Sequence, residues 1–299
     1  MKPLLSVGVI TYNQEQYIEQ CLDSILAQTT DFDFEIVIGE DWGTDRTRSI
    51  CEQYALKYPH KIRLLSSPKN VGGVRNLLQV IEACESPFVA LLEGDDYWID
   101  TAKLQKQVSK LQSDERMTIC FTSRKNYEEN TQIFVAVDEN TEGVFSLIDF
   151  AKNTYFHTST AVFRKPNDCS FLNKLADFKI GDRPLFIALL AESKGYAYKM
   201  ADISSVFRIN YNSSFTPTKP FERNLLVAEM YNQLKALYPD LAVYFNHHLN
   251  VADYFILRES FKNKDKKEVK RLAFQILKRP TTAWDWSLKG KTALHLLSI

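Results

Sequence analysis

The sequence predicts an α/β protein in which a mostly parallel central sheet is flanked by helices and followed by a helical C-terminal region. Three observations support this fold class: short apolar runs rich in β-branched residues, an even spacing of those runs, and an amphipathic pattern in each gap. The runs begin at residues 4, 35, 62 and 88, which are 31, 27 and 26 residues apart. That spacing matches a βαβ unit of about 30 residues, which produces parallel strands joined by right-handed crossovers.

Each element of this first part follows from its own pattern. The runs are apolar without alternation, as in strands that are buried on both faces of a parallel sheet. They cover residues 4–10, 35–38, 62–65 and 88–92. Between them, apolar residues recur at the spacing of one helix face. These residues are Ile18, Cys21, Leu22, Ile25 and Leu26 in the first gap, Ile50, Cys51, Tyr54 and Tyr58 in the second, Val74, Leu77, Leu78 and Ile81 in the third, and Leu104, Val108 and Leu111 after the fourth run.

The rhythm changes after residue 117. Shorter strands, some of them antiparallel, are expected at 118–123, 131–137, 159–163, 197–200 and 204–209, and short helices at 147–152 and 184–193. From residue 221 onward the pattern is mostly helical. The Ser-, Thr- and Pro-rich segment 212–220 predicts a boundary. We therefore expect one domain over 1–215, divided into halves 1–112 and 113–215, and a helical region over 216–299.

Bulk composition excludes several classes of protein. The 37 Lys and Arg residues balance 37 Asp and Glu residues, which argues against a nucleic-acid partner. The five cysteines have no CxxC spacing, so neither a disulfide scaffold nor a zinc knuckle is indicated. No apolar run approaches the roughly 20 residues of a membrane helix, and the N-terminus is typical of a strand rather than a signal peptide. We expect a cytoplasmic protein that can lie at the inner face of the membrane.

Carboxylates gather where the early strands end. Segments 11–15, 39–45, 66–73 and 93–98 follow the four strands, and ligands of open α/β sheets bind beyond the carboxyl ends of the strands. Hard oxygen ligands suit Mg²⁺ or Mn²⁺, whose shell substrate phosphates commonly complete. The alternative is that Asp95 and Asp96 only cap a turn. The first turn has no GxGxxG, which disfavours a dinucleotide oxidoreductase, and the chain has no phosphate loop of the GxxxxGK[ST] type.

These segments together resemble the family 2 glycosyltransferases of the GT-A fold, in particular a bacterial branch whose metal motif contains GDDYW. Four segments carry the resemblance in the expected order. They are the opening strand, TYN turn and first helix at 6–29, the second-strand segment EIVIGEDWGTDRT at 35–47, NVGG at 70–73 with Arg75 and Asn76, and FVALLEGDDYW at 88–98, with its DXD-type metal motif. Looser matches follow at 156–165, 180–190 and 206–216.

The resemblance implies an inverting enzyme that is dependent on Mn²⁺ or Mg²⁺. It would transfer a hexosyl or N-acetylhexosaminyl group from a nucleotide sugar, UDP-linked first of all, to a glycan or lipid-linked acceptor in bacterial surface polysaccharide biosynthesis. Asp182 matches the general base, and Asp96 with Asp95 the metal motif. The donor-binding positions are Ile10, Thr11, Tyr12, Asn13, Glu15, Asp41, Gly73, Arg75 and Asp95, and the acceptor or sugar contacts are Trp98, His157 and Arg208.

Several positions depart from the family pattern or have a structural alternative. Trp42 and Gly43 replace a small pair, Glu93 stands where many members have Asp, and Asn210 stands where the branch often has His. Asp182 precedes Arg183-Pro184 and would also serve as a helix N-cap. Trp98 has a core-packing alternative, and His157 a structural one.

Two other functions remain open from sequence. One is a catalytically silent module that binds a sugar nucleotide or a glycan, although Asp95, Asp96 and Asp182 are all present. The other is a nucleotidyltransferase, which is disfavoured because the first turn is not a Gly-rich, Lys-containing loop. The sequence does not predict the oligomeric state.

Charge is concentrated near the C-terminus. Between Arg258 and Lys291 there are eleven Lys or Arg and four Asp or Glu residues, a net charge of +7. Val269, Leu272, Ala273, Ile276 and Leu277 form an apolar stripe beside these cations. A basic amphipathic helix of this kind predicts contact with an anionic membrane. The alternative is a helix that packs on the rest of the chain.

Overall fold

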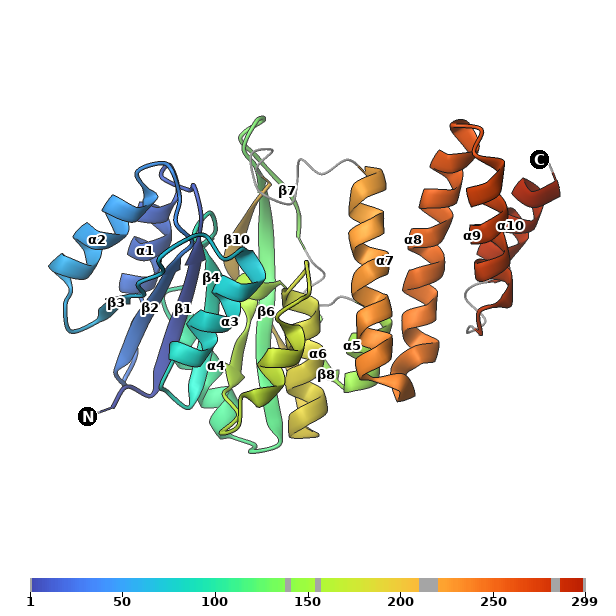
Figure 1. Cartoon of the computed structure of the whole chain (residues 1–299). Coiled ribbons are helices and arrows are strands. Elements are labelled where there is room, and N and C mark those ends of the chain that lie inside the picture. Colours follow the sequence, from blue (N-terminus) through green and yellow to red (C-terminus); the bar gives the residue numbers. More distant parts are fainter. Residues whose placement is uncertain (1, 138–140, 154–156, 210–219, 281–285, 298–299) are drawn as a thin grey trace. The chain divides into compact units, whose positions relative to one another are not determined.

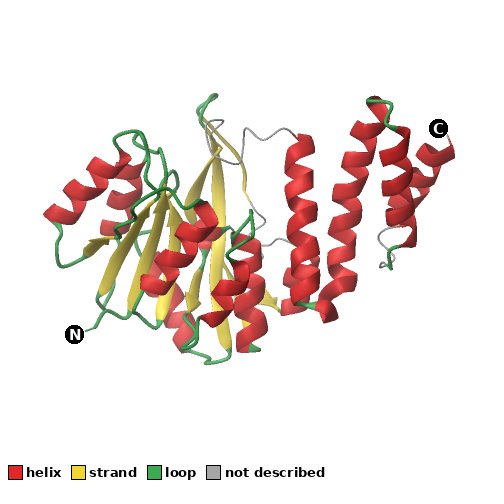
Figure 2. Ribbon diagram, in the orientation of Figure 1, coloured by secondary structure: helices red, strands yellow, loops and turns green. Residues whose placement is uncertain are grey.

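The computed structural model describes residues 2–137, 141–153, 157–209, 220–280 and 286–297. The chain forms two compact units. The first comprises 1–147, 155–177 and 181–210, and the second comprises 148–154, 178–180 and 211–299. The expected boundary at 212–220 falls almost entirely outside the described residues, as does Asn210. Within the described residues, all strands belong to the first unit (Figure 2).

Four parallel strands form the first half of the sheet, as predicted. They lie in the order β3-β2-β1-β4, with β1 hydrogen-bonded to both β2 and β4. Their bounds are Leu5–Thr11 for β1, Phe34–Glu40 for β2, Ile62–Leu64 for β3 and Phe88–Glu93 for β4. Because all four run the same way, their carboxyl ends meet at one edge of the sheet (Figure 1).

Helices cover both faces of this sheet. On one face α1 (Ile18–Leu26), α2 (Thr47–Lys57) and α4 (Lys103–Gln112) share a core with alternate residues of the strands. On the other face α3 (Gly73–Ala83) approaches so closely that a Cβ on Gly39 would lie 2.4 Å from Val80 Cγ2. Glycine in β2 therefore allows this helix to pack.

The second half of the sheet is mixed. β6 pairs parallel with β10, and the remaining pairings in this half are antiparallel. The bounds are Tyr97–Trp98 for β5, Met117–Glu128 for β6, Ile133–Val137 for β7, Gly143–Phe145 for β8, Val162–Arg164 for β9 and Tyr196–Ile209 for β10. The helix of this half is α6 (Asp182–Ser193), which follows a 3₁₀ turn, η2 (Ser170–Leu175).

Two strand predictions in this half were wrong. The strand expected at 159–163 begins only at Val162, because η1 (Thr158–Thr160) is a 3₁₀ turn closed at its start by His157 and Thr160. The two extended segments at 197–200 and 204–209 are one strand, β10, whose pairing with β6 shifts register where they join. A bulge accommodates the extra residues without ending the strand.

The described part of the second unit contains helices and turns but no strand. Its elements are α5 (Leu147–Lys152), all but the first residue of which belongs to this unit, α7 (Pro220–Leu237), the turn η3 (Pro239–Leu241), α8 (Ala242–Lys262), α9 (Lys266–Lys278) and α10 (Trp286–Leu297). The apolar stripe of α9 is buried against Ile256 and Leu257 of α8. The stripe therefore packs within the chain rather than facing a membrane. In the part of the chain that the structure covers, no helix combines the length and the apolar character needed to cross a membrane.

Candidate functional site

The loop after β4 lies tightly against the end of β1. The Gly94 amide donates to the Ile10 carbonyl at 2.9 Å, and the Asp96 amide donates to the Glu93 carbonyl at 3.0 Å. A Cβ on Gly94 would lie 2.6 Å from the Thr11 hydroxyl, so only glycine fits here. The turn places the carboxylates of Glu93 and Asp96 at the carboxyl edge of the sheet.

Three potential metal ligands meet behind this turn. Atoms of Glu93, Asp96 and His157 lie within 4.8 Å of one another. Asp96 is 1% exposed, and its Oδ1 accepts the Arg208 amide at 3.0 Å. Its Oδ2 lies 3.6 Å from His157 Nδ1, and neither this oxygen nor Glu93 Oε2 has a hydrogen-bond partner among the described residues. Buried carboxylate oxygens without a partner fit a divalent cation, because an unpaired buried charge is otherwise costly.

The pKa shifts within the cluster also favour a cation site. Burial, with Asp95 next in importance, raises the pKa of Glu93 to about 7. Burial, with the charges of Asp95 and Glu93, holds the pKa of Asp96 well above its usual range. Burial and the Arg124 charge hold the pKa of His157 well below its usual range, so its imidazole is neutral and able to ligate a metal. A bound cation would favour ionisation of both carboxyl groups.

A local turn positions His157. Its Nδ1 lies 3.0 Å from the Ser159 hydroxyl, and its carbonyl accepts the Thr160 hydroxyl at 2.7 Å. The ring packs against Phe207 of β10 at a centroid distance of 4.5 Å. The ring is therefore held on two sides. The structure places His157 among the metal-type ligands, a different position from the acceptor contact that the sequence predicts.

Trp98 lies in the core. It is 4% exposed, and its indole Nε1 donates to the Ser159 carbonyl at 2.9 Å. Lys103 Nζ lies over the indole ring at 4.6 Å. The sugar contact expected of Trp98 is therefore wrong, because the ring has no open face. The indole instead supports the turn that carries His157.

Asp95 stands apart from the three clustered ligands. The Gln14 side chain and the Arg208 charge oppose the rise that burial causes in its pKa. The sequence singles out Asp95 and Asp96 as the metal residues. It treats Glu93 only as a replacement for Asp, although Glu93 ends the same strand. His157 lies 61 residues after Asp96 in the chain, so no local pattern links it to the motif.

Arg208 is enclosed by aromatic rings. Its guanidinium carbon lies 5.0 Å from the Tyr17 ring centroid and 4.9 Å from that of Tyr97. It also pairs with Glu129 at 3.4 Å and donates to Gln20. The sequence predicts an acceptor or sugar contact here. The structure adds that the Arg208 backbone orients Asp96 and that its side chain ties β10 to α1 and β5.

Asp182 is the first residue of α6 and half-buried. The N-cap is Gly181, so the capping role considered for Asp182 was wrong. The charge of Asp182 contributes to the raised pKa of Glu93, which places its carboxylate near the cluster. A carboxylate in the first turn of a helix is stabilised in its ionised form.

Asp41 organises the loop before α3. Its carboxylate accepts the amides of Val71 at 2.7 Å and Gly72 at 2.9 Å, and its carbonyl accepts the Asn70 side chain at 2.7 Å. Gly72 has a φ of 89°, which favours glycine. Each oxygen of Asp41 thus already holds one amide, with a second lone pair remaining for a ligand.

The other predicted donor positions line the same edge. Tyr12 is exposed, Ile10 is half-buried and Thr11 is buried at the end of β1. Asn13 Oδ1 accepts the Thr44 amide at 2.7 Å, and Glu15 accepts the Arg46 amide at 2.9 Å. These bonds tie the first and second loops together, so Asn13 and Glu15 have structural partners already.

The N-terminus of α3 is open. Gly73 begins the helix, and a Cβ there would meet no atom within 4 Å. Arg75 pairs with Asp177 at 2.9 Å, and both side chains are exposed. Because an exposed pair is worth about 0–1 kcal/mol, Arg75 can exchange this partner for an anionic ligand.

Trp42 is a further candidate site residue, which in the sequence stands out only as a departure from the family pattern. It follows β2, is exposed and has a φ of 58°. Arg48 lies over its ring at 4.7 Å. Tyr12 follows the neighbouring strand β1, so two exposed aromatic side chains occupy adjacent strand ends. The sequence contained an indication of this role, because Trp42 is a large aromatic residue in a turn segment where small residues are usual.

Comparisons with known proteins identify the family of the chain. The model of the family described as glycosyl transferase family 2 matches residues 6–176, more than half of the chain. A protein of Mycobacterium tuberculosis described as uncharacterized is 42% identical over 117 residues, 39% of this chain and 34% of its own length. The putative teichuronic acid biosynthesis glycosyltransferase TuaG of Bacillus subtilis is 36% identical over 107 residues, 36% of this chain and 41% of its own length. The matches thus span about two fifths or less of these relatives.

Solved structures share the fold. Staphylococcus aureus TarS 1–349 in complex with UDP-GlcNAc matches with a TM-score of 0.66 and 18% identity, over 100% of this chain and 89% of that one. The mannosyltransferase PcManGT from Pyrobaculum calidifontis, in complex with GDP-Man and Mn²⁺, matches with a TM-score of 0.59 and 16% identity, over 100% and 87%. At this level of identity the likeness shows the GT-A glycosyltransferase fold.

Proposed function

The chain belongs to glycosyl transferase family 2, and from that premise we propose that it is a metal-dependent, inverting glycosyltransferase. It transfers a hexosyl or N-acetylhexosaminyl group from a nucleotide sugar to a glycan or lipid-linked acceptor. The observation that carries the proposal is the cluster of Glu93, Asp96 and His157 at the carboxyl edge of the sheet. An enzyme that expels a nucleoside diphosphate needs positive charge at this place.

Glu93, Asp96 and His157 would hold Mn²⁺ or Mg²⁺. When bound, the cation neutralises negative charge on the leaving diphosphate. One oxygen each of Glu93 and Asp96 has no hydrogen-bond partner within the described ranges, which supports this assignment. Asp95, which belongs to the same motif, is proposed to contact the ribose or the sugar and would be a further candidate for holding the cation.

The donor lies along the ends of β1 and β2 and the start of α3. The exposed rings of Tyr12 and Trp42 are suited to border the nucleotide base. The open N-terminus of α3 and the Arg75 guanidinium are suited to the diphosphate. A UDP-sugar is the preferred donor, since TarS is solved with UDP-GlcNAc. PcManGT is solved with GDP-Man, which makes a GDP-sugar the competing choice.

Asp182 is the proposed general base. It accepts the proton of the acceptor hydroxyl while that oxygen attacks the anomeric carbon in line with the leaving diphosphate. It lies in the first turn of α6, and its charge contributes to the raised pKa of Glu93. Attack from the face opposite the leaving group inverts the anomeric configuration. A positioned base contributes about 10²–10⁴-fold to the rate.

The proposed setting is the synthesis of a bacterial surface polysaccharide. The relative TuaG is described as a putative teichuronic acid biosynthesis glycosyltransferase. A lipid-linked acceptor would place the enzyme in the cytoplasm, at the inner face of the membrane. No nucleic-acid partner is proposed, in keeping with the zero net charge.

A panel of nucleotide sugars scored for donor hydrolysis tests the proposal. The panel is run with Mn²⁺ and with a chelator, on the whole chain and on Asp168→Ala as a surface carboxylate control. We expect release of the nucleoside diphosphate from one donor, only with metal, and equally in the control. Tight binding of a nucleotide sugar without hydrolysis or transfer would favour the non-catalytic module instead.

A further inference from the structure

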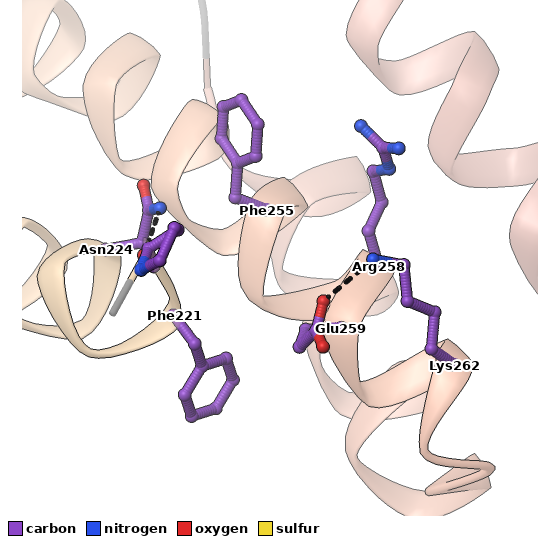
Figure 3. Close-up of a pocket in the computed structure, with 7 residues that line it drawn as sticks. Phe221, Asn224, Phe255, Arg258, Glu259 and Lys262 are labelled. Atoms are coloured by element: carbon purple, nitrogen blue, oxygen red, sulfur yellow. Dashed lines mark hydrogen bonds and ion pairs between the residues drawn. The ribbon is translucent and has the colours of Figure 1, made fainter.

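A groove opens between α7 and α8 in the helical unit. Its aromatic wall consists of Phe221 from α7 and Phe255 from α8, and its polar wall includes Arg258, Glu259 and Lys262 (Figure 3). Both phenylalanines are exposed, Phe255 by 49%. The groove has a volume of about 240 Å³. Exposed aromatic side chains beside a groove indicate a binding surface for an apolar group.

Helix periodicity explains why these groups share one wall. Phe255, Arg258 and Lys262 are spaced i, i+3 and i+7 on α8, so they follow one face of that helix. The opposite face of α8 carries Ile256 and Leu257, which pack against α9. The groove wall is therefore the outer side of α8, left over after the helix has buried its other face.

The cationic groups continue beyond the groove into the turn between α8 and α9. Between residues 258 and 271 there are seven Lys or Arg and three Asp or Glu residues, a net charge of +4. The acids are engaged locally: Glu259 pairs with Lys262 at 3.1 Å, Asp265 accepts the Glu268 amide at 3.0 Å, and Glu268 pairs with Arg271. All seven cations of this stretch are exposed: Arg258, Lys262, Lys264, Lys266, Lys267, Lys270 and Arg271.

The structure excludes the apolar stripe of α9 as the membrane-binding surface. Val269, Leu272, Ala273 and Ile276 of α9 are buried, so the apolar stripe that the sequence pairs with these cations cannot meet a membrane. The cations remain exposed, and the exposed phenylalanines near them in the chain are Phe255, Phe261 and Phe274. Of these three, Phe255 lines the groove together with Arg258 and Lys262. Apolar and cationic groups that can act together thus lie on the outer side of α7 and α8.

We propose that this groove and the cationic turn at 262–270 form a docking surface for anionic phospholipid at a membrane. The headgroup phosphates pair with Arg258 and Lys262, and the two phenylalanine rings enter the boundary between headgroups and acyl chains. Phenylalanine is one of the residues that interfacial segments bury at that boundary, and each Lys or Arg near an anionic surface adds about fivefold to binding. The inference rests on the helical unit alone and is independent of the proposed donor chemistry.

Vesicle flotation of the full chain tests this surface. We expect binding to phosphatidylglycerol-containing vesicles, weak binding to pure phosphatidylcholine, and loss of binding at high salt. Arg258→Gln is expected to weaken binding about fivefold, and Phe255→Ala by about the same factor. Nucleotide-sugar hydrolysis in solution should be unchanged in both variants, which separates failure of this proposal from failure of the catalytic one.

Matched controls sit elsewhere in the chain. Phe274 on α9 is 53% exposed, close to Phe255, but lies outside the groove, and Lys57 is an exposed cation on α2. Phe274→Ala and Lys57→Gln should bind vesicles as the wild type does. Equal loss in Phe274→Ala, or salt-insensitive binding to neutral vesicles, would overturn the proposal. So would a dimer in solution that Phe255→Ala converts to a monomer, because the groove would then belong to a second copy.

Discussion

At the scale of single residues, the site combines groups that the sequence identifies with groups that only the fold brings in. The resemblance of EGDDYW to the metal motif of the family implies a metal-binding carboxylate at Asp96. It does not predict that Glu93 and His157 are its neighbours. The position of the Glu93 carboxylate could not be predicted, because this long side chain can point in several directions. His157 depends on a 3₁₀ turn whose place against β4 follows from strand pairing between distant segments.

The general-base assignment leads to a sharp substitution. Asp182→Asn keeps the size and the helix-start position but cannot accept the proton. We expect turnover to fall by about 10²–10⁴-fold, with UDP affinity largely retained, because the donor does not need this carboxylate. Steady-state transfer rates and calorimetry with UDP measure the two effects. A parallel fall in UDP affinity would show that Asp182 serves donor binding rather than proton transfer.

At the scale of elements, the parallel half of the sheet was predictable and the mixed half was not. Strands buried on both faces leave continuous apolar runs, so β1 to β4 stand out in the sequence. The short strands β5, β8 and β9 have two or three residues each, too few for a period to show. The register shift within β10 likewise leaves no local pattern.

The contact between α3 and β2 can be tested at one glycine. A Cβ on Gly39 would lie 2.4 Å from both Asn76 Oδ1 and Val80 Cγ2. Gly39→Ala should therefore lower the free energy of unfolding by about 1–3 kcal/mol. The matched control is Gly290→Ala in α10, where a Cβ meets nothing within 4 Å. This substitution should raise the free energy of unfolding by about 0.5–1 kcal/mol. Urea unfolding of both variants provides the comparison, and equal effects would contradict the packing described.

A buried lysine makes stability depend on pH. Lys103 in α4 is buried, and its Nζ donates to Gln107 Oε1 at 2.6 Å. Burial lowers its pKa from 10.5 to about 7. Above pH 7 the unfolded chain therefore holds a proton that the folded chain has released, so this group favours folding increasingly as pH rises towards 10.5.

Lys103→Met tests that dependence. Between pH 7 and pH 9 the wild type should gain about 2–3 kcal/mol relative to the variant. The pH dependence of urea unfolding for the two chains gives this difference directly. Parallel curves for wild type and variant would mean that Lys103 keeps its ordinary pKa in the folded state.

At the scale of the whole molecule, zero net charge conceals two opposite arrangements. The first unit collects Glu93, Asp95 and Asp96 at one edge of its sheet. The helical unit carries a +7 segment between residues 258 and 291. One arrangement suits a cation and a diphosphate, and the other an anionic surface. The net charge of the chain reveals neither arrangement, whereas the distribution of charged residues along the sequence indicates both.

The central claim is that the cluster at the carboxyl edge binds the donor diphosphate through a divalent cation. Calorimetry of UDP binding, with Mn²⁺ and with a chelator, on the wild type and on Asp96→Ala, tests it most directly, with Asp168→Ala as the control. We expect UDP binding that Mn²⁺ strengthens in the wild type and in Asp168→Ala but not in Asp96→Ala. Undiminished, Mn²⁺-dependent UDP affinity in a folded Asp96→Ala chain would contradict this claim.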